Sequence, residues 1–268
     1  MLVCTIGDLT LDVVVRVAAP LAIGGDTNAA IRFTPGGQAA NVAAWAAALG
    51  ADARFIGKRG ADEPGRLALA GLEAARVQVL GPAEGRNGVI CSLVSPDGER
   101  SMAADRLAAA ELRPDEVEPG WLDGCEHLFV SGYALLREPV RGAARRAIEL
   151  ARAGGADVSV DLATWSAIRD AGASEFRDVV AAATPDVVFA NEAEDRIFGG
   201  PLAGAKWILK RGARGCSFDG DERVALPVED VVDSTGAGDA LAAGWIVGGS
   251  ELALEAAARC VTRLGSMP

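Results

Sequence analysis

The chain has 268 residues, half of them hydrophobic, and a formal net charge of −11 at pH 7. This acidic balance argues against nucleic acid as a partner, because phosphate backbones attract basic faces. No apolar run approaches the roughly 20 residues that span a bilayer, and five scattered cysteines without a C-x-x-C pair argue against a disulfide framework or zinc site. We therefore expect a cytoplasmic protein without a membrane segment, built as one α/β domain over residues 1–268.

Two hairpins stand out as elements built from strands alone. Residues 2–7 predict a buried first strand, residues 12–17 a half-exposed strand, and residues 30–33 its return strand. Residues 89–94 and 99–102 predict a second hairpin, joined by a turn at residues 95–98. The hairpins, at about 12–34 and 88–106, predict a small β lid on the domain.

The rest of the chain alternates between strands and helices. Strands are predicted at residues 53–57, 128–131, 158–161, 187–190, 207–209 and 216–218, and helices at residues 38–49, 63–76, 140–153 and 251–264. The spacing of about thirty residues between successive strands predicts a right-handed parallel sheet with crossover helices. The lone histidine, His127, is expected to start a strand and not to act as a catalytic base.

Polar residues follow several of these strands where the strands end. They are Asp8, Ser131, Asp161, Asn191 and Glu192. Ligands of open parallel sheets bind beyond the carboxyl ends of the strands. We therefore expect one site at this edge of the sheet.

A glycine turn late in the chain predicts an anion site. Gly236 and Gly238 flank Ala237 and lead into a helix, so that backbone N–H groups and the positive helix end converge. Asp239 follows at the rim, where we expect the helix end to keep it ionised. A carboxylate there can accept a proton from an attacking hydroxyl. The alternative is that Asp239 only caps a helix.

Other phosphate-binding patterns are missing from the sequence. There is no G-x-x-x-x-G-K-[ST] loop, Leu241 stands where a dinucleotide fingerprint needs its third glycine, and no H-R-D or D-F-G set is present. These observations disfavour a Walker-type nucleotide site, a nicotinamide oxidoreductase and a protein kinase.

Two segments in order resemble the two signatures of the ribokinase-like (PfkB) carbohydrate kinase family: PGGQAANVA at residues 35–43 and DSTGAGD at residues 233–239. The NEAE segment at 191–194 and the GARG turn at 212–215 also fit this family. The resemblance covers essentially the whole chain. It implies a central, mostly parallel sheet flanked by helices, a small β lid, and an ATP-dependent kinase that uses Mg²⁺.

The resemblance also implies roles for individual residues. Asp239 is similar to the family's catalytic base, and Gly236, Ala237 and Gly238 to its anion hole. The implied sugar-binding residues are Asp8, Asp12, Gly36, Gly37 and Asn41. The implied nucleotide-binding residues are Asn191, Gly212, Gly215 and Thr235. Lys210 stands where many relatives have threonine, and we expect it near the phosphates of the nucleotide. Glu194 would organise Mg²⁺ through water, and Asp233 would lie near a monovalent cation such as K⁺.

Several alternatives stay open at this point. Asn191 and Glu194 could be a helix cap and a first-turn acid, and Asp12 a solvated strand-edge residue. The acceptor is expected to be a ribose-like or related small sugar, because few aromatic residues are available to stack on a nucleobase. Adenosine, cytidine or pseudouridine, or the acidic sugar 2-keto-3-deoxygluconate facing Arg100 and Arg106, are the alternatives. A non-catalytic sugar or nucleotide sensor, and a homodimer through the lid, are further expectations.

Overall fold

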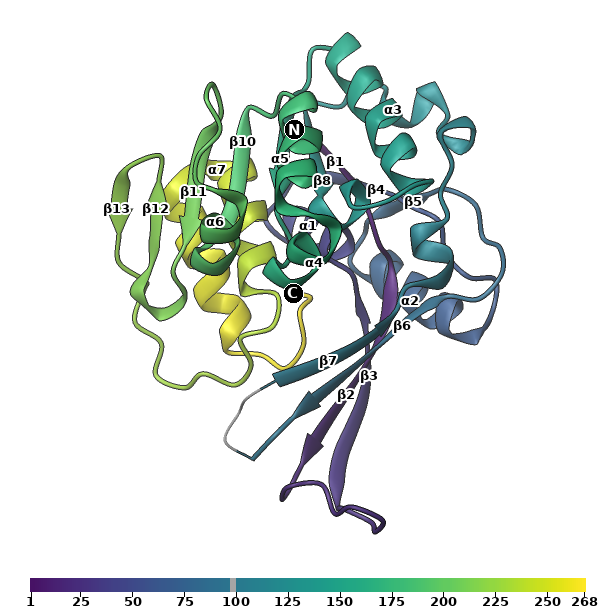
Figure 1. Cartoon of the computed structure of the whole chain (residues 1–268), viewed down its shortest axis with the longest axis vertical. Coiled ribbons are helices and arrows are strands. Elements are labelled where there is room, and N and C mark those ends of the chain that lie inside the picture. Colours follow the sequence, from purple (N-terminus) through teal and green to yellow (C-terminus); the bar gives the residue numbers. More distant parts are fainter. Residues whose placement is uncertain (97–99) are drawn as a thin grey trace.

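The computed structural model describes residues 1–96 and 100–268, so the centre of the predicted turn at 95–98 lies outside the described residues. Its main sheet has nine described strands in the order β13-β12-β11-β10-β9-β8-β1-β4-β5 (Figure 1). The strands are β1 Leu2–Ile6, β4 Asp52–Ile56, β5 Gln78–Leu80, β8 His127–Ser131, β9 Asp157–Asp161, β10 Val187–Asn191, β11 Lys206–Lys210, β12 Cys216–Phe218 and β13 Asp221–Arg223. The pairs from β11 to β5 are parallel, as the sequence predicts.

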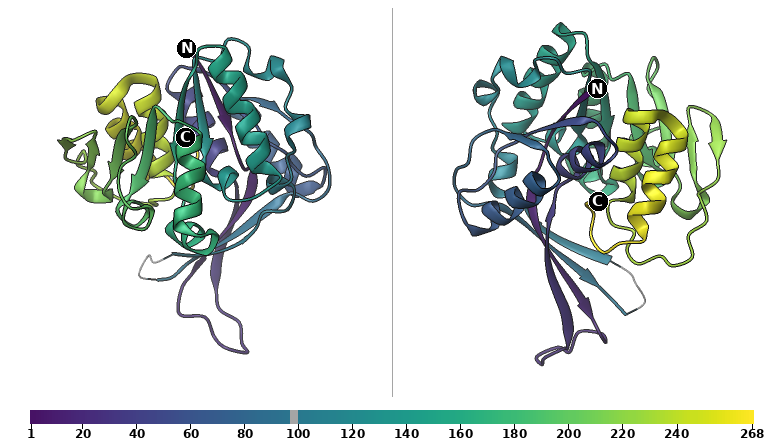
Figure 2. Two further views of the ribbon diagram at one scale, coloured as in Figure 1. Left: turned by 45° about the horizontal axis from the view of Figure 1, so that its top comes forward. Right: turned by 180° about the vertical axis from the view of Figure 1, so that it is seen from behind.

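Helices cover both faces of this sheet. They are α1 Gln38–Ala48, α2 Glu63–Ala74, α3 Val140–Ala153, α4 Trp165–Ala171, α5 Ala173–Ala182, α6 Glu192–Phe198 and α7 Ala237–Val261, with short 3-10 turns η1 Leu107–Ala110, η2 Pro114–Glu116, η3 Pro119–Leu122, η4 Gly132–Leu135 and η5 Gly212–Arg214. Helices α3 to α6 lie in front of the sheet in Figure 1, and α1 and α7 lie in front in the view from behind in Figure 2.

Side chains of the central strands point alternately to the two faces of the main sheet, and both faces are apolar. Cys4 and Ile6 of β1 join the core under α3 to α6, whereas Val3 joins the core under α1, α2 and α7. Successive side chains of a strand point to opposite faces, so a strand buried on both sides must be apolar throughout. This requirement is why the central strands read as continuous hydrophobic runs.

The predicted lid is a separate four-stranded sheet. Strands β2 Thr10–Val17, β3 Ala29–Gly36, β6 Gly88–Val94 and β7 Arg100–Asp105 follow the order β3-β2-β6-β7. The two hairpins are joined because β2 pairs with β6 in parallel, from Thr10 opposite Gly88 to Arg16 opposite Val94. The lid extends from one end of the domain (Figure 1).

Two details of the sequence interpretation need correction. Besides the two lid hairpins there is a third antiparallel strand group, because β11, β12 and β13 form an antiparallel edge of the main sheet. The helix predicted at 251–264 is the second part of α7, and it ends at Val261, before Leu264. Gly248 and Gly249 have non-helical backbone and divide α7 into two helical parts, so the prediction of a separate last helix is confirmed.

Within the described part of the chain, no helix is both long and apolar enough to cross a membrane.

Candidate active site

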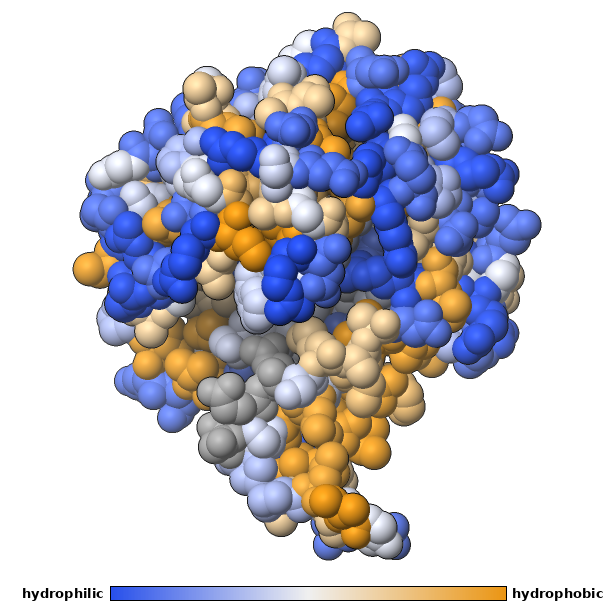
Figure 3. All heavy atoms as spheres, in the orientation of Figure 1, coloured by the Kyte–Doolittle hydropathy of each residue, from blue (hydrophilic) through white to orange (hydrophobic). Residues whose placement is uncertain are grey.

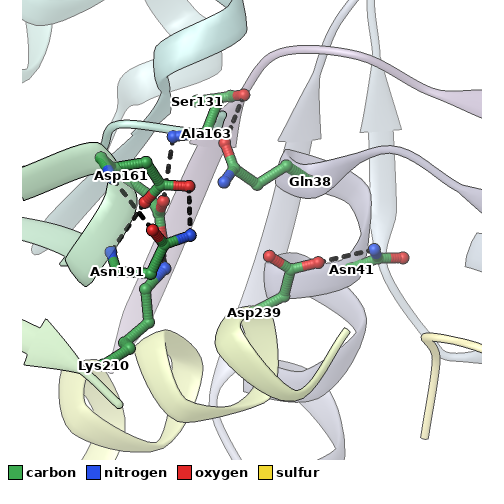
Figure 4. A network of polar contacts seen from close by, with 9 residues as sticks. Gln38, Asn41, Ser131, Asp161, Ala163, Asn191, Lys210 and Asp239 are labelled. Carbon is green, nitrogen blue, oxygen red and sulfur yellow. Dashed lines mark hydrogen bonds and ion pairs between the residues drawn. The ribbon is translucent and has the colours of Figure 1, made fainter. Parts of the chain in front are cut away.

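The polar residues at the strand ends do gather at one edge of the main sheet. Ser131 ends β8, Asp161 ends β9 and Asn191 ends β10, and these strands are neighbours. Figure 4 shows them around the first turn of α7, which carries Asp239. Parallel strands present their carboxyl ends on the same side, so the predicted gathering of these polar residues at one edge is confirmed, and their role in a site stays a prediction.

The glycine turn forms the N-terminus of α7, as the sequence indicates. Gly236 is the N-cap with φ 77°, and its carbonyl accepts a hydrogen bond from the N–H of Ala240 at 2.8 Å. A side chain at position 236 would also meet Ser266, whose Cβ lies 2.6 Å from where a Cβ would stand. Glycine is therefore required both by the left-handed backbone and by close packing. The turn leaves the N–H groups of the first helical turn without intrahelical partners, which suits an anion.

Asp239 is held by a chain of hydrogen bonds that reaches the C-terminal segment. Its Oδ2 accepts a hydrogen bond from Asn41 Nδ2 at 2.7 Å (Figure 4). The Oδ1 of Asn41 accepts a hydrogen bond from Ser266 Oγ at 2.9 Å, and the carbonyl of Ser266 accepts one from Trp45 Nε1 at 2.8 Å. The hydrogen bond from the Ser266 hydroxyl supports the orientation in which Asn41 Nδ2 faces Asp239. Among the described residues, no side chain or backbone N–H donates a hydrogen bond to Asp239 Oδ1.

Burial opposes the expectation that the helix end keeps Asp239 ionised. Burial raises the pKa of its carboxyl from 3.8 to about 7, and the charges of Asp161 and Glu194 act in the same direction. The hydrogen bond from Asn41 and the charge of Lys210 lower the pKa but do not offset the loss of water. A pKa near neutrality is well placed for a general base at physiological pH.

A second network surrounds Lys210 on β11. Its ammonium Nζ contacts Asp161 Oδ2 at 2.5 Å, and it lies 3.3 Å from where a Cβ on Gly238 would stand. The cation therefore lies beside the first turn of α7. Burial alone would lower the pKa of Lys210, but the charges of Asp161 and Glu194 more than offset it and hold the pKa above its ordinary value.

Asn191 and Glu194 form a reciprocal helix cap at the start of α6. Asn191 Oδ1 accepts hydrogen bonds from the N–H groups of Ala193 and Glu194, at 2.9 and 3.0 Å. The carboxylate of Glu194 accepts bonds from the N–H and the Nδ2 of Asn191, at 2.8 and 2.6 Å. The capping interpretation is therefore correct. Burial raises the pKa of Glu194 to about 7, although the charge of Lys210 and the hydrogen bonds from Asn191 act to lower it.

Asp12 faces the site from lid strand β2. Its Oδ1 accepts a hydrogen bond from Thr10 Oγ1 at 2.9 Å, and burial raises its pKa to about 6. A Cβ on Gly36 would stand 2.3 Å from this carboxylate, so glycine makes room for it. Asp12 is thus enclosed between two lid strands and is not a solvated edge residue.

A cavity of about 930 Å³ joins the lid to the cradle. The predicted site residues that line this cavity are Asp8, Asp12, Gly37, Asn41, Thr235, Gly236 and Asp239. Its wall also includes Arg106, which forms an ion pair with Asp8 and lies over the ring of Tyr133, 3.7 Å from the ring centroid. A volume of this size is at the upper end of the range for small-molecule sites.

Other predicted residues lie outside this cavity. Gly212 and Gly215 lie in the β11–β12 connection, with Gly212 starting η5. Asp233 holds the loop that precedes the cradle, because Oδ1 accepts hydrogen bonds from the N–H and Oγ1 of Thr235 and Oδ2 accepts one from the N–H of Gly265. Its visible role is to brace the turn against the C-terminal segment.

Sequence reasoning missed Ser266 and Tyr133 and left Asp161 without a role. Ser266 and Tyr133 gave no signal, because their contacts join segments far apart in the chain. Asp161 was placed at a strand end, but only the register of β9, β10 and β11 shows that Lys210 reaches it.

The described side chains do not by themselves form a metal site. Over residues 1–96 and 100–268, no three His, Cys, Asp or Glu side chains gather closely enough to hold an ion. Glu194, with its two oxygens fixed by Asn191, could accept hydrogen bonds from water bound to Mg²⁺. Glu194 and Asn191 therefore fit a metal ion whose ligands are mainly phosphate oxygens and water.

Comparison with known proteins gives one consistent result. The family model described as pfkB family carbohydrate kinase matches residues 1–267. An ATP-dependent ribose-1-phosphate kinase of Halopiger xanaduensis is 32% identical over 96% of this chain and 90% of its own length. A 5-dehydro-2-deoxygluconokinase of Shouchella clausii is 30% identical over 80% of this chain and 73% of its own. The crystal structure of adenosine kinase from Sinorhizobium meliloti superimposes with a TM-score of 0.88 at 25% identity, covering 99% and 95% of the two chains.

Proposed function

The chain belongs to the pfkB family of carbohydrate kinases, and we propose that it transfers the γ-phosphoryl group of ATP to a hydroxyl of a small sugar. The observation that carries this proposal is the position of Asp239. Its carboxylate lies on the first turn of α7 beside the glycine cradle, and it lines the same cavity as Asp12 and Asn41. Base, anion site and polyol-binding groups thus meet in one space.

The roles of these residues follow from their contacts. Asp12 and the lid would orient the sugar, so that one hydroxyl lies against Asp239 Oδ1. That oxygen accepts the proton as the hydroxyl attacks, while Asn41 holds Oδ2. The N–H groups of Gly236, Ala237 and Gly238 and the Lys210 ammonium would stabilise charge on the phosphoryl oxygens. Enclosure beneath the lid would exclude water and limit wasteful hydrolysis of ATP.

ATP and Mg²⁺ are part of the proposal. When bound, Mg²⁺ would neutralise negative charge on the phosphates during transfer. Asn191 and Glu194 would hold its water ligands, and Gly212, Gly215 and Thr235 would border the nucleotide. A monovalent cation near Asp233 remains a prediction, and a comparison of turnover in potassium and choline chloride tests it.

The cavity offers little aromatic surface for a nucleobase, which favours a sugar over a nucleoside. Tyr133 is the only aromatic residue among the described residues that line it. Tyr133 carries the Arg106 guanidinium on its ring, which leaves little free aromatic surface for a nucleobase. The relatives named for ribose 1-phosphate and 5-dehydro-2-deoxygluconate support a sugar acceptor as well. The similarity in fold to an adenosine kinase keeps nucleosides in the test.

A coupled assay for ADP release tests the proposal directly. The acceptors are ribose, fructose, ribose 1-phosphate, 2-keto-3-deoxygluconate, adenosine, cytidine and pseudouridine, each with Mg²⁺ and with EDTA. We expect Mg²⁺-dependent, acceptor-dependent turnover with a sugar. Turnover only with nucleosides would overturn the sugar assignment, and ATP binding without any phosphoryl transfer would favour the sensor.

A homodimer through the lid is the proposed assembly. The outer side chains of Ile31 and Phe33 on β3 are 57% and 64% exposed, and Figure 3 shows apolar residues along the lid. Pairing of two lids would cover them. Sedimentation of the wild type against Phe33→Glu tests this: a dimer that becomes a monomer supports it, and a wild-type monomer contradicts it.

A further inference from the structure

One hydrogen bond joins the lid to the loop that leads into the glycine cradle. The guanidinium Nη2 of Arg16, on lid strand β2, donates to the carbonyl of Val232 at 3.3 Å, across 216 positions of the chain. Residues 224–236, all of them described, connect β13 to α7 without a helix or strand, and we call them the cradle loop. The position of such a loop depends on a few contacts, and the contact with Arg16 comes from the lid.

The peptide group of Val232 is held from two sides. Its N–H donates to the carbonyl of Val261, at the end of α7, at 2.8 Å, while its carbonyl accepts the bond from Arg16. The next residue, Asp233, accepts hydrogen bonds from the N–H and Oγ1 of Thr235, which directly precedes the glycine cradle. Because Arg16 binds a backbone carbonyl, it fixes the path of the chain and not the rotamer of a side chain. The contact from the lid therefore reaches the cradle within a few bonds.

The same strand carries the carboxylate proposed to bind the sugar. Asp12 and Arg16 are four residues apart in β2, so their side chains leave the same face of the strand about 13 Å apart. Strand β2 pairs with β3 on one side and with β6 on the other, which fixes it inside the lid sheet. Asp12 lines the cavity, whereas Arg16 is exposed and does not. Arg16 is therefore placed to act on the cradle loop and not on the acceptor.

We infer that Arg16 is a positioning residue that couples the acceptor site to the nucleotide side of the cradle. The inference rests on the proposed function, in which the sugar binds at Asp12 and ATP beside Thr235. When an acceptor at Asp12 holds the lid in place, Arg16 holds the cradle loop in the position that presents the cradle N–H groups to phosphate. Coupling between two sites is reciprocal, so bound nucleotide strengthens acceptor binding by the same factor.

The test compares the wild type with Arg16→Met, which removes the donors, and Arg16→Lys, which keeps a cation that can donate. Arg32→Met is the matched control, because Arg32 is an exposed arginine opposite Val14 on the same face of the lid, and it forms no hydrogen bond or ion pair with the described residues. The affinity for AMP-PNP with Mg²⁺ is measured by calorimetry without acceptor and with saturating ribose, fructose or ribose 1-phosphate. Hydrogen exchange of residues 224–236 is measured in the same proteins without any ligand.

We expect an acceptor to raise the AMP-PNP affinity of the wild type by on the order of fivefold. Arg16→Met should reduce this factor to about one, Arg16→Lys should keep part of it, and Arg32→Met all of it. Without ligand, the cradle loop should exchange faster in Arg16→Met than in the wild type or Arg32→Met.

Coupling that survives Arg16→Met, an equal loss in Arg32→Met, or unchanged exchange of the cradle loop in Arg16→Met would overturn the inference. A wild type whose AMP-PNP affinity no acceptor changes would overturn it as well. Acceptor-dependent release of ADP by that same wild type would leave the kinase assignment standing, so the two failures can be told apart.

Discussion

Removal of the Ser266 hydroxyl tests whether the C-terminal segment positions the base. Ser266→Ala keeps the Cβ that packs on Gly236 and removes only the donor to Asn41 Oδ1. The Asn41 amide can then rotate and present its oxygen to Asp239. Because the hydrogen bond from Asn41 lowers the pKa of Asp239, its loss raises that pKa.

The magnitude follows from the strength of this contact. A hydrogen bond to a charged group contributes about 1.5–3 kcal/mol, so loss of even part of it shifts the pKa by about one unit. The base must be deprotonated to work, so the acidic limb of kcat/KM, near pH 7 in the wild type, should move upward. Turnover at pH 7 should fall by about fivefold, because a rise of the pKa from about 7 to about 8 lowers the deprotonated fraction from about one half to about one tenth, and it should recover at higher pH.

The assay is a pH profile of kcat/KM by coupled ADP release. Thr262→Ala is the matched control, since it removes another hydroxyl hydrogen bond, from Thr262 Oγ1 to the carbonyl of Arg259, in the same segment. In an Asn41→Ala background, Ser266→Ala should add little, because the two residues act through one contact. An unchanged acidic limb, or full additivity of the two substitutions, would refute the reasoning.

Other substitutions test the remaining parts of the site. Asp12→Ala should weaken sugar binding much more than ATP binding in calorimetry. Loss of ATP affinity instead would show that Asp12 lies in the nucleotide site and not in the sugar site. Gly36→Ala should have the same effect, because a Cβ there would stand 2.3 Å from the Asp12 carboxylate; normal sugar affinity would contradict this. Lys210→Met should weaken ATP binding and cost on the order of 3–5 kcal/mol of unfolding free energy, because it leaves the buried Asp161 carboxylate without its cation. Adding Asp161→Asn should restore melting temperature but not ATP affinity, and recovery of both would exclude a phosphate contact by Lys210.

The ionised carboxylate of Asp239 should lower the free energy of unfolding at neutral and alkaline pH. Its pKa is raised from 3.8 to about 7 in the folded state, so the folded state binds the proton more tightly than the unfolded chain. Stability contributed by the protonated form is present below about pH 4 and is lost as the pH rises through about 7, by at most about 4 kcal/mol. Asp239→Asn should therefore melt at a higher temperature than the wild type at pH 8 but not at pH 4, and an equal gain at both pH values would contradict the pKa assignment.

The sequence predicts the parts of this molecule that depend on local pattern. Most of the parallel strands, helices α1, α2 and α3 and both lid hairpins follow from apolar periodicity and turn residues, whereas α4, α5 and α6 are not predicted. The glycine turn before Ala237 and the strand-end polar residues locate the site for the same reason, since backbone geometry there demands particular residue types.

Charge states and long-range contacts do not follow from local pattern. The helix end suggests an ionised Asp239, but burial dominates and raises its pKa. The contact of Ser266 with Asn41 joins positions 225 residues apart, and the stacking of Arg106 on Tyr133 joins the lid to β8. Such contacts depend on how the lid and the C-terminal segment pack on the sheet.

The most direct test of the whole account is turnover of Asp239→Asn with the preferred sugar, measured beside ATP binding. A general base contributes roughly 10²–10⁴-fold, so we expect kcat to fall by at least that lower bound while ATP affinity is retained. Turnover close to that of the wild type would contradict the assignment of Asp239 as the group that accepts the proton.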